Sequence, residues 1–227
     1  MNDRLNNLEL LEAFREVLSQ YPEGVVFSTS FGQEDQVITD LIFRNNLPIE
    51  VFTLDTGRVF QETYELMDKT RAKYKKPIKV CFPDASDIEK LTSEKGFNSF
   101  YESIDNRKEC CFLRKIKPLK KALAGNKVWI TGLRSEQSDN RSQMQMWEFD
   151  EANDIFKFNP LLHWTQNQME TYLEENKVPQ NVLHKKGFIS IGCQPCTRAI
   201  EPGEHPRAGR WWWETSHKEC GLHGIKS

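Results

Sequence analysis

Five of the six cysteines are spaced in a way that suggests two kinds of sulfur chemistry. Cys110 and Cys111 are adjacent, Cys193 and Cys196 form a CxxC, and Cys220 stands alone in the sequence ECGLH. Two pairs of thiolates are a common ligand set for an inorganic centre. A separate thiol near the chain end suits a nucleophile. The spacing therefore predicts one bound centre and one reactive cysteine.

The adjacent pair favours an iron–sulfur cluster over a single zinc ion. Neighbouring side chains of a helix point about 100° apart, so Cys110 and Cys111 are poorly placed to hold one small ion but can reach different corners of a [4Fe–4S] cube. Zinc sites with four cysteines typically use two CxxC-like knuckles, and only one pair here has that form. Zinc, a redox dithiol and buried free thiols are the alternatives.

Cys220 is the predicted nucleophile because of its charged neighbours. His217, Lys218 and His223 flank it in the sequence. Cationic neighbours lower the pKa of a thiol and so increase the fraction of reactive thiolate. The alternative is an incidental, exposed cysteine of the chain end.

The composition excludes several classes of protein. A net charge of −2 over 227 residues gives no overall positive field, so nucleic-acid binding is not expected. The start MNDRLNNLELLEAF lacks the features of a signal peptide, and no run of about 18 apolar residues occurs. We therefore expect a soluble, cytoplasmic protein, in which cysteines are ligands or catalytic thiols and not disulfides. Cys81, in the apolar run IKVCF, is expected in the core.

Strand and helix patterns alternate along the chain. The expected strands are 25–27, 49–54, 78–82 and 128–131, with a hairpin over 147–158, and the expected helices include 8–18, 61–74, 88–95, 108–123 and 164–175. This alternation predicts an α/β fold, with a mostly parallel sheet and helices on both faces. Sequence patterns typical of helices and strands become weak after residue 184. We expect one domain, in which 1–184 form the nucleotide-binding body and 185–227 an irregular, ligand-bearing tail.

Two polar turns lie where predicted strands meet helices. They are STSFGQED, residues 28–35, and LDTGRVF, residues 54–60. In an open parallel sheet, ligands bind beyond the carboxyl ends of the strands. Ser28, Ser30 and Gly32 are therefore candidates to present hydroxyls and backbone N–H groups to a phosphate. The alternative is an ordinary N-cap with a glycine turn.

Taken together, several motifs resemble the assimilatory adenylyl-sulfate reductases, the iron–sulfur branch of the adenylyl-sulfate and phosphoadenylyl-sulfate reductase family. They are SFGQED, LDTGRVFQETYEL, CCFLRKIKPL, WITGLRSEQS, GCQPCTR, AGRWWWE and KECGLH. The resemblance implies a Rossmann-like adenine nucleotide alpha-hydrolase fold and a [4Fe–4S] cluster on Cys110, Cys111, Cys193 and Cys196. It also implies that Cys220 attacks adenylyl sulfate, releasing AMP, and that thioredoxin then liberates sulfite.

The resemblance further assigns site residues and an assembly. Lys115 would lie between the cluster and the substrate sulfate, and His223 beside the nucleophile. The residues that would bind the nucleotide and its sulfate are Ser28, Ser30, Gly32, Leu54, Thr56, Gly132, Arg134, Arg141, Arg207 and Arg210. Members of the family favour homo-oligomers.

Three other functions compete with this interpretation. One is the same reduction of phosphoadenylyl sulfate, and another is a redox sensor in which Cys220 has no role. The third is a tRNA-thiolating enzyme of the related pyrophosphatase fold, but such enzymes carry an SGGxDS loop where this chain has SFGQED.

Overall fold

The computed structural model describes residues 1–137 and 143–214 of the chain. By its contacts the chain divides into two compact units. The first comprises Met1–Thr53, Glu62–Lys79 and Leu123–Asn181, and the second comprises Leu54–Gln61, Val80–Ala122 and the residues from Val182 onward. The division into 1–184 and 185–227 stays a prediction, and each unit is described below by itself.

A six-stranded sheet forms the centre of the fold. Its strands are β1 (Val25–Ser28), β2 (Glu50–Leu54), β3 (Lys79–Cys81), β4 (Val128–Ile130), β5 (Trp147–Asp150) and β6 (Ile155–Phe158), in the order β3-β2-β1-β4-β6-β5. The pairs β1–β2, β1–β4 and β4–β6 are parallel, and the hairpin β5–β6 is antiparallel. The predicted mostly parallel sheet is confirmed.

The central strands are buried on both faces, as parallel sheets require. Val25 and Phe27 of β1 point into the main hydrophobic core, while Val26 between them is also only 2% exposed. Their β-branched and aromatic side chains suit a pleated surface. These strands read as continuous apolar runs for that reason, and not as alternating patterns.

Five helices belong mainly to the first unit. They are α1 (Asn2–Leu5), α2 (Leu10–Gln20), α3 (Gln33–Arg44), α4 (Gln61–Tyr74) and α8 (Gln166–Glu175). Helix α8 begins at the predicted polar start, where Thr165 and Gln168 form a reciprocal capping box.

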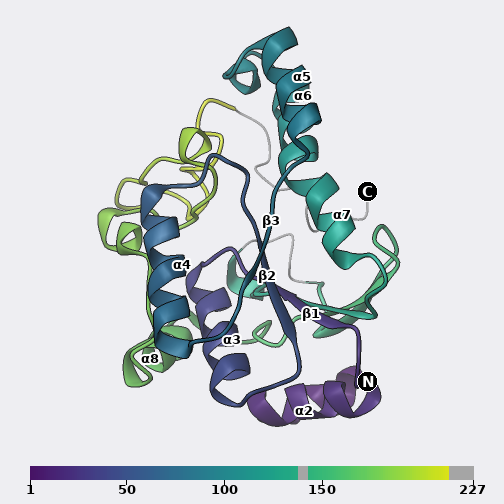
Figure 1. Cartoon of the computed structure of the whole chain (residues 1–227). Coiled ribbons are helices and arrows are strands. Elements are labelled where there is room, and N and C mark those ends of the chain that lie inside the picture. Colours follow the sequence, from purple (N-terminus) through teal and green to yellow (C-terminus); the bar gives the residue numbers. More distant parts are fainter. Residues whose placement is uncertain (138–142, 215–227) are drawn as a thin grey trace. The chain divides into compact units, whose positions relative to one another are not determined.

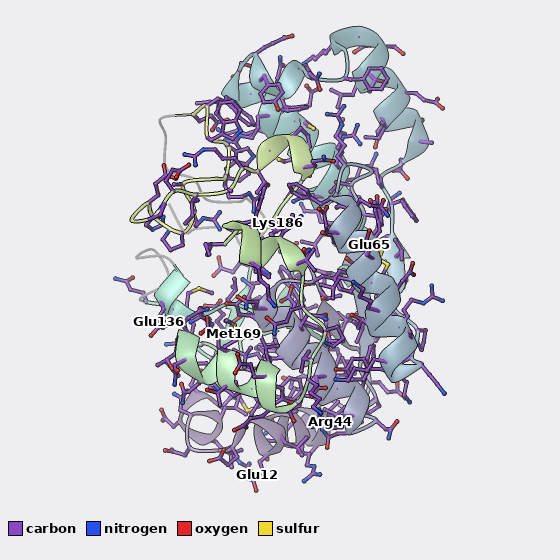
Figure 2. The ribbon with its side chains drawn as sticks, turned by 90° about the vertical axis from the view of Figure 1, so that its left-hand side faces the viewer. Glu12, Arg44, Glu65, Glu136, Met169 and Lys186 are labelled. Atoms are coloured by element: carbon purple, nitrogen blue, oxygen red, sulfur yellow. The ribbon has the colours of Figure 1, made fainter. Side chains whose placement is uncertain are left out.

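A buried carboxylate ties α3, α4 and α8 together. Asp40 of α3 is fully buried and accepts hydrogen bonds from the hydroxyls of Tyr74 in α4, at 2.5 Å, and Tyr172 in α8, at 2.8 Å. Figure 1 shows the three helices side by side, and Figure 2 shows α8, with Met169 labelled, next to α3, with Arg44 labelled. A carboxylate of this kind must be paired to be tolerated in the interior, so the network stabilises one arrangement of the helices.

The second unit contains α5 (Ala85–Lys95), α6 (Ile104–Cys111) and most of α7 (Lys117–Leu123). The predicted single helix over 108–123 is wrong in one respect, because a π-helical turn, Phe112–Ile116, separates α6 from α7. Single π turns are frequent at functional sites. The described residues after 184 form irregular structure, short 3-10 turns and isolated β-bridges, with no α-helix and no strand of the sheet.

Candidate active site

In the first unit, the loop after β1 is organised by an aspartate. The backbone N–H and the hydroxyl of Ser30 both donate to Asp35 Oδ2, at 2.5 and 2.6 Å. Gly32 is the N-cap of α3, and the hydroxyl of Ser28 accepts a hydrogen bond from the indole of Trp129 at 2.8 Å. The structure thus brings Ser30 and Gly32 to the start of a helix, where backbone N–H groups suit an anion.

Gly132 lies against the same aspartate. A Cβ added at Gly132 would be 2.1 Å from Asp35 Oδ1, so only glycine allows β4 to approach this loop. Burial raises the pKa of Asp35 to about 6. Sequence reasoning missed Asp35, although it ends the SFGQED motif.

Arg134 is buried and already surrounded by acceptors. Its guanidinium donates to Glu34 at 2.9 Å, Glu136 at 2.9 Å, Gln166 at 2.6 Å and the carbonyl of Trp164 at 3.2 Å. These contacts link the GLRSE segment to the SFGQED loop through Glu34. The direct contact to substrate assigned to Arg134 stays a prediction.

Replacing Asp35 by asparagine is expected to change how stability depends on pH. The unfolded chain loses the Asp35 proton near pH 3.8, whereas the folded protein holds it up to about pH 6. The wild type therefore loses stability as the pH rises through 6, and Asp35→Asn does not lose this contribution. The variant should gain roughly 3 kcal/mol relative to wild type between pH 4 and 7, measured by urea unfolding.

The exposed Asp68 of α4 provides the control for this titration. Asp68→Asn makes the same chemical change at the surface, where a substitution usually alters the free energy of unfolding by less than about 0.5 kcal/mol. A constant difference for Asp35→Asn would contradict the assignment of the titration to Asp35.

In the second unit, the four cysteines predicted as ligands lie together. Cys110 and Cys111 end α6, Cys193 is the N-cap of the 3-10 turn Gln194–Cys196, and Cys196 is the last residue of that turn. All four pack in one hydrophobic group with Phe100, Trp211 and Trp213. In the described part of the chain, no three histidine, cysteine or acidic side chains converge on a single metal ion.

The turn of the DTGR motif contacts the CxxC directly. The N–H of Gln194 donates to the carbonyl of Arg58 at 2.8 Å, and Val59 and Cys193 form an antiparallel bridge. A hydrogen bond of 3.2 Å joins Thr56 Oγ1 to Cys193 Sγ. Since the N–H of Arg58 donates to the same Thr56 oxygen, the Thr56 proton is available to the sulfur.

Burial raises the pKa values of the cysteine thiols at this site, and nearby positive charge lowers them. Burial raises the pKa of Cys196 to about 12 and also raises the pKa of Cys110. Burial would raise the pKa of Cys193 too, but Lys115 and the Thr56 hydrogen bond hold it below its ordinary value. The predicted site residue Lys115 therefore lies within electrostatic reach of a predicted ligand.

Arg114, next to the partly buried Lys115, is a buried cation at this site that was not among the predicted site residues. Its Nη1 donates to the carbonyl of Thr56 at 2.7 Å, and its charge acts on both Cys110 and Cys193. Its Nε is buried and has no hydrogen-bond partner among the described residues. The clue in the sequence was its position in CCFLRK, four residues after Cys110.

Two tail arginines of the prediction have different surroundings. Arg210 is buried against Gly192, where an added Cβ would be 2.5 Å from its guanidinium. Arg207 is partly exposed.

Leu54 is partly buried at the end of β2. Three further predicted residues, Arg141, Cys220 and His223, lie outside the described residues.

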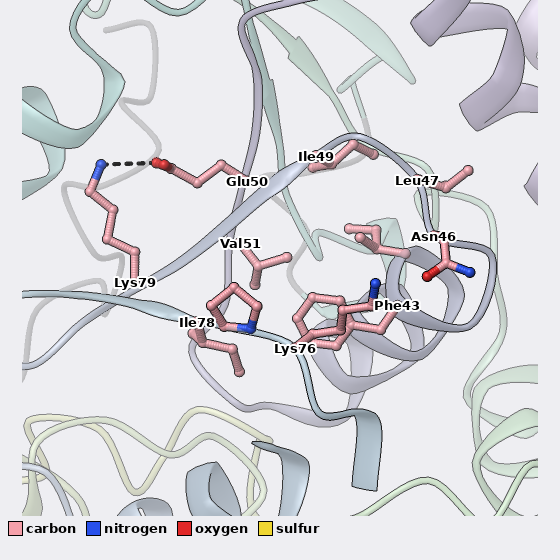
Figure 3. Close-up of a pocket in the computed structure, with 11 residues that line it drawn as sticks. Phe43, Asn46, Leu47, Ile49, Glu50, Val51, Lys76, Ile78 and Lys79 are labelled. Atoms are coloured by element: carbon pink, nitrogen blue, oxygen red, sulfur yellow. Dashed lines mark hydrogen bonds and ion pairs between the residues drawn. The ribbon is translucent and has the colours of Figure 1, made fainter. Parts of the chain in front are cut away.

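One cavity, shown in Figure 3, lies away from the predicted phosphate loop. It measures about 280 Å³ and is lined by residues such as Phe43, Ile49 and Ile78, with the Glu50–Lys79 ion pair of 2.9 Å beside it. It lies at the amino ends of β2 and β3, whereas the SFGQED loop follows the carboxyl end of β1. Ligands of open α/β sheets bind at the carboxyl ends, so the cavity is not the expected substrate site.

No helix in the described part of the chain is both long and apolar enough to span a bilayer.

Comparison with known proteins gives consistent matches over most of the chain. A family model described as phosphoadenosine phosphosulfate reductase domain matches residues 24–199. A protein of Agrobacterium fabrum named adenosine 5'-phosphosulfate reductase is 50% identical over 87% of this chain and 76% of its own length. The protein of the same name from Rhizobium meliloti is 49% identical over 98% of this chain and 84% of its own length.

Solved structures agree on the fold. The structure of phosphoadenylyl-sulfate reductase from Candida auris, a phosphate complex, matches with a TM-score of 0.75 and 30% identity, over 87% of this chain and 94% of that one. FMN adenylyltransferase from Candida glabrata matches with a TM-score of 0.56 at 16% identity, over 96% of this chain and 76% of that one, which is a likeness of fold alone. The predicted α/β nucleotide-binding fold class is confirmed.

Proposed function

The chain belongs to the phosphoadenosine phosphosulfate reductase family, and from that premise we propose that it reduces adenylyl sulfate to sulfite and AMP in sulfate assimilation. The observation that supports this most directly is the gathering of two cysteine pairs beside Thr56 and Lys115, in a chain about half identical to proteins named adenosine 5'-phosphosulfate reductase. The enzyme is thus an oxidoreductase acting on a sulfur group.

The proposed reaction has two displacements at sulfur. The Cys220 thiolate attacks the sulfur of adenylyl sulfate, an S–S bond forms, and the bond from sulfur to the bridging oxygen breaks as AMP leaves with the electron pair. A thiolate of thioredoxin then attacks Cys220 Sγ and sulfite leaves with the electron pair of the S–S bond. The second thiol of thioredoxin resolves the mixed disulfide and regenerates Cys220, so thioredoxin supplies both electrons.

The first displacement brings an anionic thiolate to a sulfonate that already carries negative charge. Fixed cations must reduce this repulsion. Lys115 and Arg210 are proposed for this role because their charge acts on the sulfur of Cys193. His223 is proposed to lie beside Cys220 and to hold a proton there.

A [4Fe–4S] cluster fits the donor set of the second unit. Cys110, Cys111, Cys193 and Cys196 would hold it, since the four thiols share one group without converging on a single ion. A hydroxyl, a buried guanidinium and an ammonium act on these sulfurs, as expected around a group that carries negative charge. When bound, the cluster would supply a fixed electrostatic centre that organises Lys115, with no change of oxidation state.

Replacing Thr56 by valine is expected to weaken retention of the cluster by about 10- to 100-fold, the usual cost of losing a hydrogen bond to a metal ligand. The variant removes the hydroxyl that reaches Cys193 Sγ at 3.2 Å. Iron released to a chelator over time is the measurement. Thr56→Ser keeps the hydroxyl and serves as the control, so equal iron loss in the two variants would contradict the role of this hydrogen bond.

The other partners belong to the same proposal. Thioredoxin is the proposed reductant, a homo-oligomer the proposed assembly and the cytoplasm the proposed location. The described residues offer no helix able to cross a membrane, which is compatible with that location.

Mass spectrometry of peptides from the full-length protein tests the proposed function. The protein is mixed with adenylyl sulfate without reductant, quenched and digested, and a sulfonate is expected on the peptide that contains Cys220. A parallel reaction with phosphoadenylyl sulfate tests the second candidate, which the likeness to the Candida auris reductase supports. Absence of the adduct with both nucleotides would refute the proposal.

A further inference from the structure

A buried ion pair joins α6 to the last described residues of the chain. Arg107 Nε donates to Glu214 Oε1 at 2.8 Å and Arg107 Nη2 donates to Glu214 Oε2 at 3.0 Å. The side chains are only 10% and 5% exposed. A bidentate arginine–carboxylate pair of this kind has a defined geometry, but burying two charges is costly and is weak evidence for a gain in stability.

The guanidinium of Arg107 also lies over the ring of Trp211. This guanidinium lies 4.5 Å from the centre of the ring, and the guanidinium of Arg210 lies 5.0 Å from the same centre. Trp211 is 2% exposed, and its backbone N–H donates to the carbonyl of Cys196 at 3.1 Å. Its φ of +42° is unfavourable for a bulky residue, so surrounding contacts must hold it in this conformation.

These contacts connect the cysteine group to the segment that precedes Cys220. Arg107 lies one helical turn before Cys110 and Cys111 and also interacts with the sulfur of Cys111. Glu214 stands six residues before Cys220. Because an extended chain spans at most about 3.6 Å per residue, the Cα atom of Cys220 can lie no farther than roughly 20 Å from the Cα atom of Glu214.

We propose that Arg107 and Glu214 are positioning residues, which anchor the start of the catalytic segment against the cysteine group so that Cys220 meets the substrate sulfur in a productive orientation. This inference rests on the proposed role of Cys220. Neither side chain touches the reacting atoms in this scheme. Their effect is on the orientation of the nucleophile, where a displacement of about 1 Å can cost 100-fold in rate.

A single-turnover experiment on the full-length, iron-containing protein tests the proposal. Wild type, Glu214→Gln and Arg107→Met are mixed with adenylyl sulfate and quenched at intervals, and sulfonate on Cys220 is measured by mass spectrometry. We expect each variant to form the adduct about 10- to 100-fold more slowly. Iron content, visible absorption and the affinity for AMP should equal those of wild type, which a general structural defect would not allow.

Two further variants sharpen the test. Glu201→Gln removes the same charge from an exposed position of the terminal segment and should react at the wild-type rate. If Arg107 and Glu214 act as one unit, the double variant should be no slower than the slower single variant.

Three outcomes would overturn the positioning role. These are wild-type rates in both single variants, a rate loss that parallels loss of iron, and fully additive losses in the double variant. Failure of wild type itself to form the adduct would instead refute the proposed function, so the two failures are distinguishable.

Discussion

Replacing Cys220 by serine is expected to lower sulfite formation by at least about 10⁴-fold, because the chain would lose the thiol proposed as the nucleophile that accepts the sulfonate. A hydroxyl with an ordinary pKa is almost entirely protonated at neutral pH and is a much weaker nucleophile than a thiolate. The measurement is the steady-state rate of sulfite release with adenylyl sulfate and thioredoxin. The adduct on the terminal peptide should also disappear.

Cys81 provides the matched control for this variant. It is a partly buried cysteine of β3, not the core residue expected from its apolar run, and it lies outside the group formed by the other four described cysteines. Cys81→Ser should keep both the rate and the adduct. Sulfite release by Cys220→Ser at the wild-type rate would exclude a covalent intermediate on that sulfur.

Replacing Cys196, a proposed ligand of the proposed cluster, by alanine is expected to remove the iron and to lower activity by more than about 100-fold, since loss of a ligand should cost more than loss of a ligand's hydrogen bond. Cys196 is only 8% exposed and is packed with Phe100 and Trp211 in the small core of the second unit. Since metal binding to such a core also contributes to folding, the variant should unfold at a lower temperature. Iron per chain, visible absorption and the melting temperature are the measurements.

The control for the cluster variant is Cys81→Ala, which shortens a cysteine outside the four-cysteine group. It should keep its iron. A Cys196→Ala protein with a full complement of iron and normal colour would exclude Cys196 as a ligand. Full activity in an iron-free preparation would exclude any need for the cluster.

The order of the elements was predictable because it depends on local patterns. The runs VVF, IEVFTL and VWI predicted strands at β1, β2 and β4, and the helix predicted over 61–74 has the same bounds in the structure. Apolar periodicity reports on the side chains of one segment at a time. The π-helical turn after Cys111 was not predictable in this way, since an apolar pattern does not report a local change of hydrogen bonding from i→i+4 to i→i+5.

The surroundings of charged residues were the least predictable part of the site. The resemblance assigned Arg134 to the substrate site, and nothing in the sequence indicated that its guanidinium is buried among Glu34, Glu136 and Gln166. Asp35 and Arg114 carried no strong signal, yet one organises Ser30 and the other reaches Thr56. Such partners are distant in the sequence, so their pairing depends on how the chain folds.

By itself, the sequence determined the α/β fold class, the pairing of four cysteines as candidate ligands and the separate identity of Cys220, since all three follow from residue types and spacing along the chain. Only the tertiary structure decided that the DTGR turn approaches the CxxC through Thr56, and that Arg107 pairs with Glu214 over Trp211. Those contacts join residues more than 100 positions apart. Their geometry depends on the packing of whole elements, which local propensity does not specify.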